Sequence, residues 1–187
     1  MIDLKNASNK RGLVVIIMRG LPGSGKTTSA LVVARKLGEK GFQVEKIHSD
    51  ELRKRLKVEH TFEGRLLVYD KMFEQAEENL HAGKTVILDA TFSRVEMVMK
   101  AKQLAQKFNA RFYCIECACA TDEVAKRVSV KRDEKLFSNA DLSILEKMKN
   151  DFEEAKIPEN ALFCLDTSVS LEEKERLIEE IVEKINR

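Results

Sequence analysis

The sequence predicts an α/β domain in which a five-stranded parallel sheet lies between two layers of helices. Two observations favour this class. Short runs rich in β-branched residues alternate with longer segments of helical periodicity, which is typical of βα units. No internal repeat, low-complexity tract or linker interrupts the 187 residues. We therefore expect residues 1–187 to form a single domain.

The elements follow one another in a regular order. Strands are predicted for the apolar runs at residues 13–18, 43–48, 85–89, 111–117 and 161–166. Helices are predicted at residues 26–40 and over the apolar stripes at 66–80, 95–108 and 171–185. Ser138 and Asp141 resemble a capping box that opens one more helix. In such a sheet, ligands bind at the carboxyl ends of the strands.

The composition excludes several classes of protein. Hydrophobic residues make up 43% and charged residues 34%, too apolar for a disordered chain and too polar for a membrane protein. The apolar run from Leu13 to Met18 is too short for a signal peptide or a membrane span, so we expect a cytoplasmic protein without a membrane partner. The net charge of +2 gives no global basic field for nucleic acid.

Three of the four cysteines, Cys114, Cys117 and Cys119, lie within six positions. This spacing suits a reducing compartment better than a disulfide framework. Zinc binding is the alternative for Cys114 and Cys117, but no second pair of ligands stands nearby. We therefore expect small buried side chains in a strand.

Residues 20–27 match the whole G-x-x-x-x-G-K-[ST] pattern, between an apolar strand and the first helix. Backbone N–H groups of such a loop curl around phosphate oxygens, Lys26 reaches the terminal phosphates, and the Thr27 hydroxyl can ligate Mg²⁺. The predicted cofactors are therefore ATP and Mg²⁺. The nucleotide-binding residues predicted in this loop are Gly23, Ser24, Gly25, Lys26, Thr27 and Thr28.

Two acidic residues follow predicted strands. Asp89 ends an apolar strand, where a second Mg²⁺ ligand is expected beside Thr27, although a turn-forming role is the alternative. Asp50 follows the second strand, and its carboxylate could orient and deprotonate an attacking hydroxyl while Arg53 holds the acceptor. The alternative is that Asp50 or Ser49 caps the next helix.

Four cations stand in seven positions at residues 126–132. Mobile arginines that close over a nucleotide can stabilise the charge on a transferring phosphoryl group. We therefore predict a lid at about residues 126–140, with Arg127 and Arg132 as catalytic residues and Arg127 also on the nucleotide. A solvated basic turn is the alternative.

Together these motifs resemble the P-loop kinases grouped with phage-type polynucleotide 5'-kinases and zeta-toxin-like kinases. The resemblance covers nearly the whole chain and rests on residues 20–28, 49–53, 88–92, 126–132, 138–141 and 165–168. It implies a three-layer P-loop NTPase fold with a small mobile lid. It also implies that Asp50 is the general base, that Arg53 contacts the acceptor, and that the turn containing Thr167 borders the adenine. We also predict that Thr91 and Arg94 bind the acceptor.

The predicted activity is transfer of the γ-phosphate of ATP to a hydroxyl acceptor. Candidate acceptors are a nucleic-acid 5'-hydroxyl, a nucleoside, a sugar or a similar small molecule. The alternative is a nucleotide-binding ATPase or switch module that acts through a protein partner. Against a GTP switch, the sequence has no D-x-x-G after the strand at 85–89 and no N-K-x-D. Against a remodelling ATPase, Ala90 stands where a catalytic Glu is expected.

Overall fold

A computed structural model describes residues 12–119, 152 and 157–187. Its sheet has five parallel strands in the order β2-β3-β1-β4-β5. The strands are β1 (Val14–Arg19), β2 (Val44–His48), β3 (Thr85–Asp89), β4 (Arg111–Ala118) and β5 (Leu162–Asp166). Each lies within one residue of its predicted range, so the predicted parallel sheet is confirmed.

The helices are α1 (Lys26–Glu39), α2 (Ser49–Leu56), α3 (Phe62–His81), α4 (Val95–Lys107) and α7 (Leu171–Asn186), with a short 3₁₀ turn η2 (Glu159–Ala161). Helices α1 to α4 lie between successive strands, and α7 follows β5. The Thr61 hydroxyl accepts the Gly64 N–H and starts α3, and the Ser170 hydroxyl does the same for α7. Within the described residues, no helix has both the length and the apolarity needed to cross a bilayer. The predicted lid and the helix expected from Ser138 lie outside the described residues.

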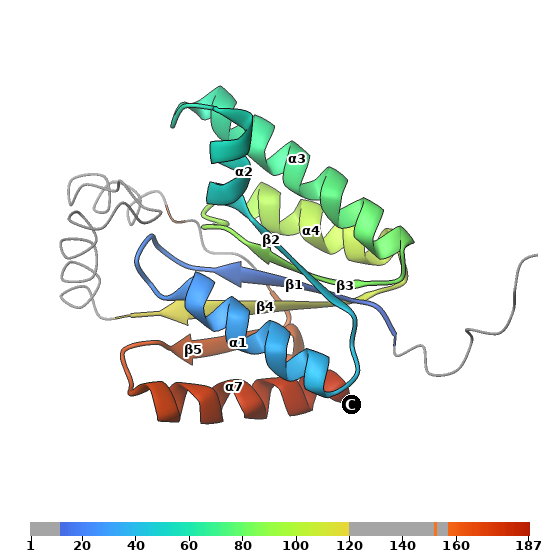
Figure 1. Cartoon of the computed structure of the whole chain (residues 1–187), viewed down its shortest axis with the longest axis vertical. Helices are drawn as coiled ribbons and strands as arrows, with labels where there is room; N and C mark the ends of the chain where they lie inside the picture. Colours follow the sequence, from blue (N-terminus) through green and yellow to red (C-terminus); the bar gives the residue numbers. More distant parts are fainter. Residues whose placement is uncertain (1–11, 120–151, 153–156) are drawn as a thin grey trace, which may run out of the picture.

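Figure 1 shows helices on both faces of the sheet, with α3 and α4 on one face and α1 and α7 on the other. Side chains of a strand alternate between faces, so β1 supplies both cores. Val15 and Ile17 join the core under α3 and α4, whereas Val14, Ile16 and Met18 join the core under α1 and α7. Because both faces are covered, the five residues from Val14 to Met18 form one uninterrupted buried apolar run.

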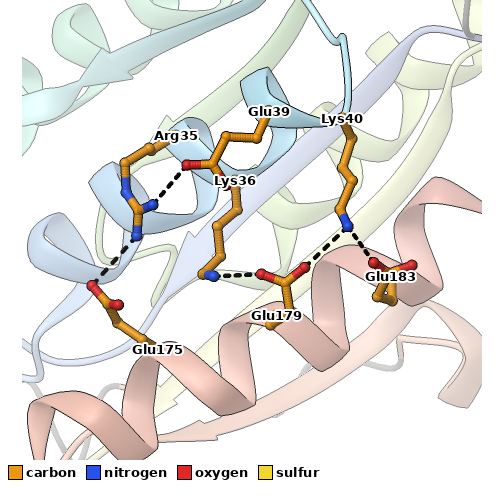
Figure 2. Close-up of polar contacts among 7 residues, drawn as sticks. All are labelled: Arg35, Lys36, Glu39, Lys40, Glu175, Glu179 and Glu183. Atoms are coloured by element: carbon orange, nitrogen blue, oxygen red, sulfur yellow. Dashed lines mark hydrogen bonds and ion pairs between the residues drawn. The ribbon is translucent and has the colours of Figure 1, made fainter.

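A row of ion pairs joins α1 to α7 along the rim of their contact (Figure 2). Lys40 Nζ lies 3.1 Å from Glu179, and Arg35 lies 3.4 Å from Glu175. The row also contains Lys36 with Glu179, Lys40 with Glu183, and Arg35 with Glu39. Exposed pairs of this kind add little stability, so the buried Ile178 and Val182 beneath them carry most of the packing that fixes α1.

Candidate active site

The carboxyl ends of β1, β2 and β3 bring the predicted site residues to one edge of the sheet (Figure 1). The register pairs His48 at the end of β2 with Asp89 at the end of β3. It also pairs Asp89 with Met18, which is followed after one residue by the glycine-rich loop. Motifs that lie far apart in the sequence therefore converge where parallel sheets bind their ligands.

The loop at residues 20–25 depends on glycine at two positions. Gly25 has φ +83°, and a Cβ there would lie 3.1 Å from the Thr167 Cβ. Gly20 has φ +145°, and a Cβ there would lie only 2.6 Å from the carbonyl oxygen of Cys117. Gly25 is also the N-cap of α1 and contributes no side-chain hydrogen bond, so the amino end of α1 is open to an anion.

Two side chains hold this loop in place. Lys26 is buried, and its Nζ donates to the carbonyl oxygen of Leu21 at 2.7 Å. Thr167, after β5, is fully buried, and its hydroxyl donates to the carbonyl oxygen of Ser24 at 2.7 Å. The Thr167 hydroxyl therefore helps to fix the conformation of the loop. A contact between Thr167 and a nucleotide stays a prediction.

His48 lies at the centre of the site, although sequence reasoning assigned it no role. Its Nε2 lies 3.0 Å from the Thr27 hydroxyl and 3.3 Å from Asp89 Oδ2. Its Nδ1 accepts the backbone N–H of Glu51 at 3.3 Å. With Nδ1 as an acceptor, the neutral ring carries its proton on Nε2 and can donate to the Thr27 hydroxyl. One buried imidazole thus joins the phosphate loop, β3 and α2.

The surroundings of Asp89 fit a divalent cation. Its side chain is 1% exposed, and neither carboxylate oxygen accepts a hydrogen bond from the described residues, because His48 Nε2 lies 3.3 Å from Oδ2 without the geometry of a hydrogen bond. An unsatisfied buried carboxylate is costly, and a cation would relieve that cost. Within the described ranges, no three His, Cys, Asp or Glu residues form a metal cluster. Mg²⁺ is usually held by one or two protein oxygens together with substrate phosphates, and Thr27 and Asp89 can supply such oxygens.

Asp50 lies in the first turn of α2 and is half-buried. The cap of α2 is His48, whose ring accepts the Glu51 N–H, so the alternative that Asp50 or Ser49 caps this helix is wrong. One turn later, Arg53 donates to the carbonyl oxygen of Glu59 at 2.7 Å. Burial lowers the pKa of Arg53, and the nearby Asp50 carboxylate opposes that shift. Asp50 and Arg53 are thus electrostatic neighbours, and their contacts with an acceptor stay predictions.

The segment after Asp89 is fastened to the phosphate loop. The Gly20 N–H donates to the Thr91 carbonyl oxygen at 3.2 Å. Phe92 adopts φ +48°, which is rare for a residue with a side chain, and two neighbours hold it there. Its N–H donates to the Tyr69 hydroxyl at 3.0 Å, and its carbonyl oxygen accepts from Arg19 Nε at 3.1 Å. No motif in the sequence indicated Arg19 or Tyr69.

The remaining predicted site residues differ in how far the structure places them. Arg94 is exposed at the start of α4, on the same segment as Thr91. Arg127 and Arg132 lie outside the described residues, so their roles stay predictions. The predicted burial of Cys114 and Cys117 in a strand is confirmed, since both are buried in β4. Burial also raises the pKa of Cys117 to about 12.

The fold and the loop define a P-loop protein, and comparison with known proteins gives its family. The model of the AAA domain family (AAA_33) matches residues 15–155, and the chain belongs to that family. An adenylate kinase from Elusimicrobium minutum is 33% identical over 138 residues, which cover 67% of this chain and 62% of that protein. The chain thus matches less than two thirds of that relative's length.

Solved structures share the fold over nearly the whole chain. The Mycobacterium tuberculosis APS kinase CysC, in complex with AMPPNP and APS, superposes with a TM-score of 0.70 at 20% identity, covering 94% of this chain and 99% of that one. Chaetomium thermophilum Kti12, in complex with ADP-AlF3, superposes with a TM-score of 0.75 at 17% identity, covering 91% of this chain and 98% of that one. Together with the family match, these folds confirm the predicted three-layer P-loop architecture and the resemblance to P-loop kinases.

Proposed function

We propose that this protein transfers the γ-phosphate of ATP to a hydroxyl group of an acceptor. One observation carries the proposal: an open helix terminus behind a glycine-rich loop, a buried carboxylate without a hydrogen bond, and a half-buried carboxylate on α2 share one edge of the sheet. Phosphoryl transfer needs these three elements, to bind phosphates, to hold Mg²⁺ and to activate the acceptor.

Each residue has a defined part in this reaction. The loop amides and Lys26 bind the phosphates, and Thr27 and Asp89 would hold Mg²⁺, with His48 hydrogen-bonded to Thr27 and 3.3 Å from Asp89. Bound Mg²⁺ supplies neutralisation of the phosphate charge. The acceptor oxygen forms a bond to the γ-phosphorus while the bond to the β–γ bridging oxygen breaks. The hydroxyl proton passes to Asp50 and then to water, and the products are ADP and a phosphate ester.

The lid and the domain extent belong to the same proposal. We infer that Arg127 and Arg132, on a lid at about residues 126–140, stabilise the charge on the transferring group within a single kinase domain of residues 1–187. The candidate acceptors are nucleosides, sugars and similar small molecules, and the 5'-hydroxyl of a nucleic acid. The Elusimicrobium relative is named an adenylate kinase, so AMP is one more candidate acceptor to test. The phosphate of AMP is already deprotonated, so transfer to it would not need Asp50 as a base.

Asp50→Asn and Asp89→Asn test the assignment. Asn keeps the shape of Asp but cannot take a proton, so Asp50→Asn should retain ATP affinity while transfer falls by roughly 10²–10⁴-fold. Asp89→Asn should instead weaken Mg²⁺-dependent ATP binding and be partly rescued by added Mg²⁺. The matched control is Asp70→Asn, at an exposed position on α3.

Labelled γ-phosphate, an acceptor panel and an assay of acceptor-independent hydrolysis complete the test. Transfer to AMP that is unaffected in Asp50→Asn would contradict the hydroxyl acceptor. Steady ATP hydrolysis by the wild-type protein, with no transfer to any acceptor, would contradict the kinase assignment and favour an ATPase or switch acting through a partner.

A further inference from the structure

Arg19 is a buried charge at the carboxyl end of β1, where the apolar run from Val14 to Met18 ends and the phosphate loop begins. The residue is 3% exposed, so its guanidinium group has lost nearly all contact with water. A buried charge is costly unless it is paired and hydrogen-bonded. An apolar side chain would continue the strand at lower cost, so the strand itself does not account for Arg19.

The guanidinium group of Arg19 holds two distant parts of the chain at once. Its Nη1 lies 2.5 Å from Oε2 of Glu116, which is the partner of Arg19 in the register between β1 and β4. Its Nε donates to the carbonyl oxygen of Phe92 at 3.1 Å. The ring of Phe152 covers one face of the group, with its centroid 4.0 Å from Cζ. Because the guanidinium group is planar and rigid, the ion pair and the ring fix the direction in which Nε donates.

Phe92 needs support from its neighbours because its backbone is left-handed, with φ +48°. For a residue with a bulky side chain this conformation is unfavourable and persists only where the surroundings impose it. The Tyr69 hydroxyl accepts the Phe92 N–H at 3.0 Å, and the two rings meet edge to face with centroids 5.4 Å apart. Arg19 holds the carbonyl oxygen on the other side of the same residue. Both ends of the strained residue are thus fixed.

Two pairs of consecutive residues connect Phe92 to the phosphate loop. Arg19 holds the Phe92 carbonyl oxygen, and the next residue, Gly20, donates its N–H to the Thr91 carbonyl oxygen at 3.2 Å. Gly20 is the first residue of the loop, and Thr91 follows Asp89 by two positions. A change in the backbone of Phe92 would therefore move the carbonyl group to which the loop is attached.

We infer that Arg19 is a positioning residue for nucleotide binding. It keeps Phe92 in the left-handed conformation, and this keeps the Thr91 carbonyl oxygen where it accepts the Gly20 N–H at the start of the phosphate loop. Arg19 acts through these residues and does not touch the nucleotide. The inference rests on nucleotide binding at the loop, which the proposed function also requires, but not on transfer to an acceptor.

Amide hydrogen exchange of the free protein, followed by NMR at the Gly20 and Phe92 N–H groups, tests this role without turnover. Arg19→Met removes a hydrogen bond from a charged group, so exchange at both amides should rise by about 10–100-fold. Arg19→Lys keeps a positive charge opposite Glu116 and should preserve the fold. One ammonium group cannot reproduce both contacts of the guanidinium fork, so exchange at both amides should still rise by about 10-fold.

Arg111→Met is the matched control. Arg111 begins β4 at the opposite edge of the sheet, and its Nη1 donates to the carbonyl oxygen of Ile185 at 2.6 Å. The substitution therefore removes the same kind of bond away from the site. It should lower stability without faster exchange at Gly20 or Phe92.

Calorimetric titration of AMPPNP at fixed Mg²⁺ measures the consequence for binding. Apparent affinity falls with the fraction of molecules in the binding-competent conformation, so Arg19→Met should weaken AMPPNP by about 10-fold. Saturating nucleotide restores that conformation, so KM for ATP should rise by about the same factor while kcat changes by less than about 3-fold. Arg111→Met should leave AMPPNP affinity within about 2-fold of the wild-type value.

The possible outcomes separate this inference from the proposed function. Wild-type exchange at both amides in Arg19→Lys, or wild-type AMPPNP affinity in a folded Arg19→Met protein, would overturn the positioning role. A kcat that falls while exchange stays unchanged would also overturn it, because Arg19 would then act on the reacting groups directly. If the exchange and affinity effects are present but no acceptor is phosphorylated, the positioning role stands and the proposed function alone is contradicted.

Discussion

Substitutions at His48 can separate two contacts made by one ring. Nδ1 accepts the Glu51 N–H at 3.3 Å and starts α2, whereas Nε2 lies 3.0 Å from the Thr27 hydroxyl and 3.3 Å from the Asp89 carboxylate. The amide of Asn reaches the position of Nδ1, and the longer Gln reaches the position of Nε2. His48→Asn therefore keeps the cap of α2, and His48→Gln keeps the contact with Thr27 and Asp89.

The two variants are expected to fail in different ways. Loss of a helix cap costs about 0.5–2 kcal/mol, so His48→Gln should lower the free energy of unfolding by that amount. The melting temperature then falls by about 2–4 °C for each kcal/mol in a chain of this size. Loss of a residue hydrogen-bonded behind a metal ligand weakens metal affinity by about 10–100-fold. His48→Asn should therefore melt close to the wild-type protein but need that much more Mg²⁺ for ATP binding.

Urea unfolding and Mg²⁺ titration of ATP binding measure the two effects separately. His48→Ala serves as the reference, because Ala makes neither contact. The His48 ring is 5% exposed, so all three variants change the same buried position. Equal losses of stability and of Mg²⁺ affinity in the Asn and Gln variants would refute the division of roles. Unchanged Mg²⁺ dependence in all three variants would show that His48 only packs against Asp89.

Three further outcomes are expected. Lys26→Ala should abolish both transfer and hydrolysis while circular dichroism shows an intact fold, and retained turnover would remove the phosphate-loop assignment. Arg127→Ala and Arg132→Ala should lower kcat by roughly 10²-fold at saturating ATP, whereas wild-type rates in both would identify a solvated basic turn. Burial raises the pKa of Cys117 from its ordinary value of 9.0 to about 12, so the unfolded chain releases this proton first. Stability should therefore fall from about pH 9 towards pH 12, by up to about 1.4 kcal/mol per pH unit, and urea unfolding of Cys117→Ala should show a smaller fall.

The parts of the fold that the sequence predicted depend on local patterns. The buried run from Val14 to Met18 has no polar interruption, and a strand covered on both faces has this pattern. Lys26, Thr27 and Asp89 could be predicted as site residues because their proposed chemistry requires fixed positions relative to a strand end. Positions at a fixed distance from a strand end can be read from the sequence alone, because they do not depend on which strands pair.

The role of His48 could not be predicted in this way, because it arises from the register between β2 and β3. The sequence around it also favoured another cap, since Ser49 and Asp50 are both good N-cap residues. In the structure, β2 extends to His48 and α2 begins at Ser49, so the last extended residue is His48, with φ −108° and ψ 125°. The place where the strand ends decided which side chain caps the helix.

Asp89 shows why stability and binding have to be considered together at this edge. A buried carboxylate without a hydrogen bond destabilises a free protein, and an apolar side chain of similar size would fit the end of β3 at lower cost. The neighbouring Leu88 and Ala90 are apolar and buried, and His48 Nε2 lies 3.3 Å from the carboxylate without a hydrogen bond to it. A cation bound against Asp89, as we propose, would make the charge favourable, and the free energy lost in the free protein would then be recovered as affinity for the cation. Asp89 is therefore better explained by the ligand it would hold than by the fold it belongs to.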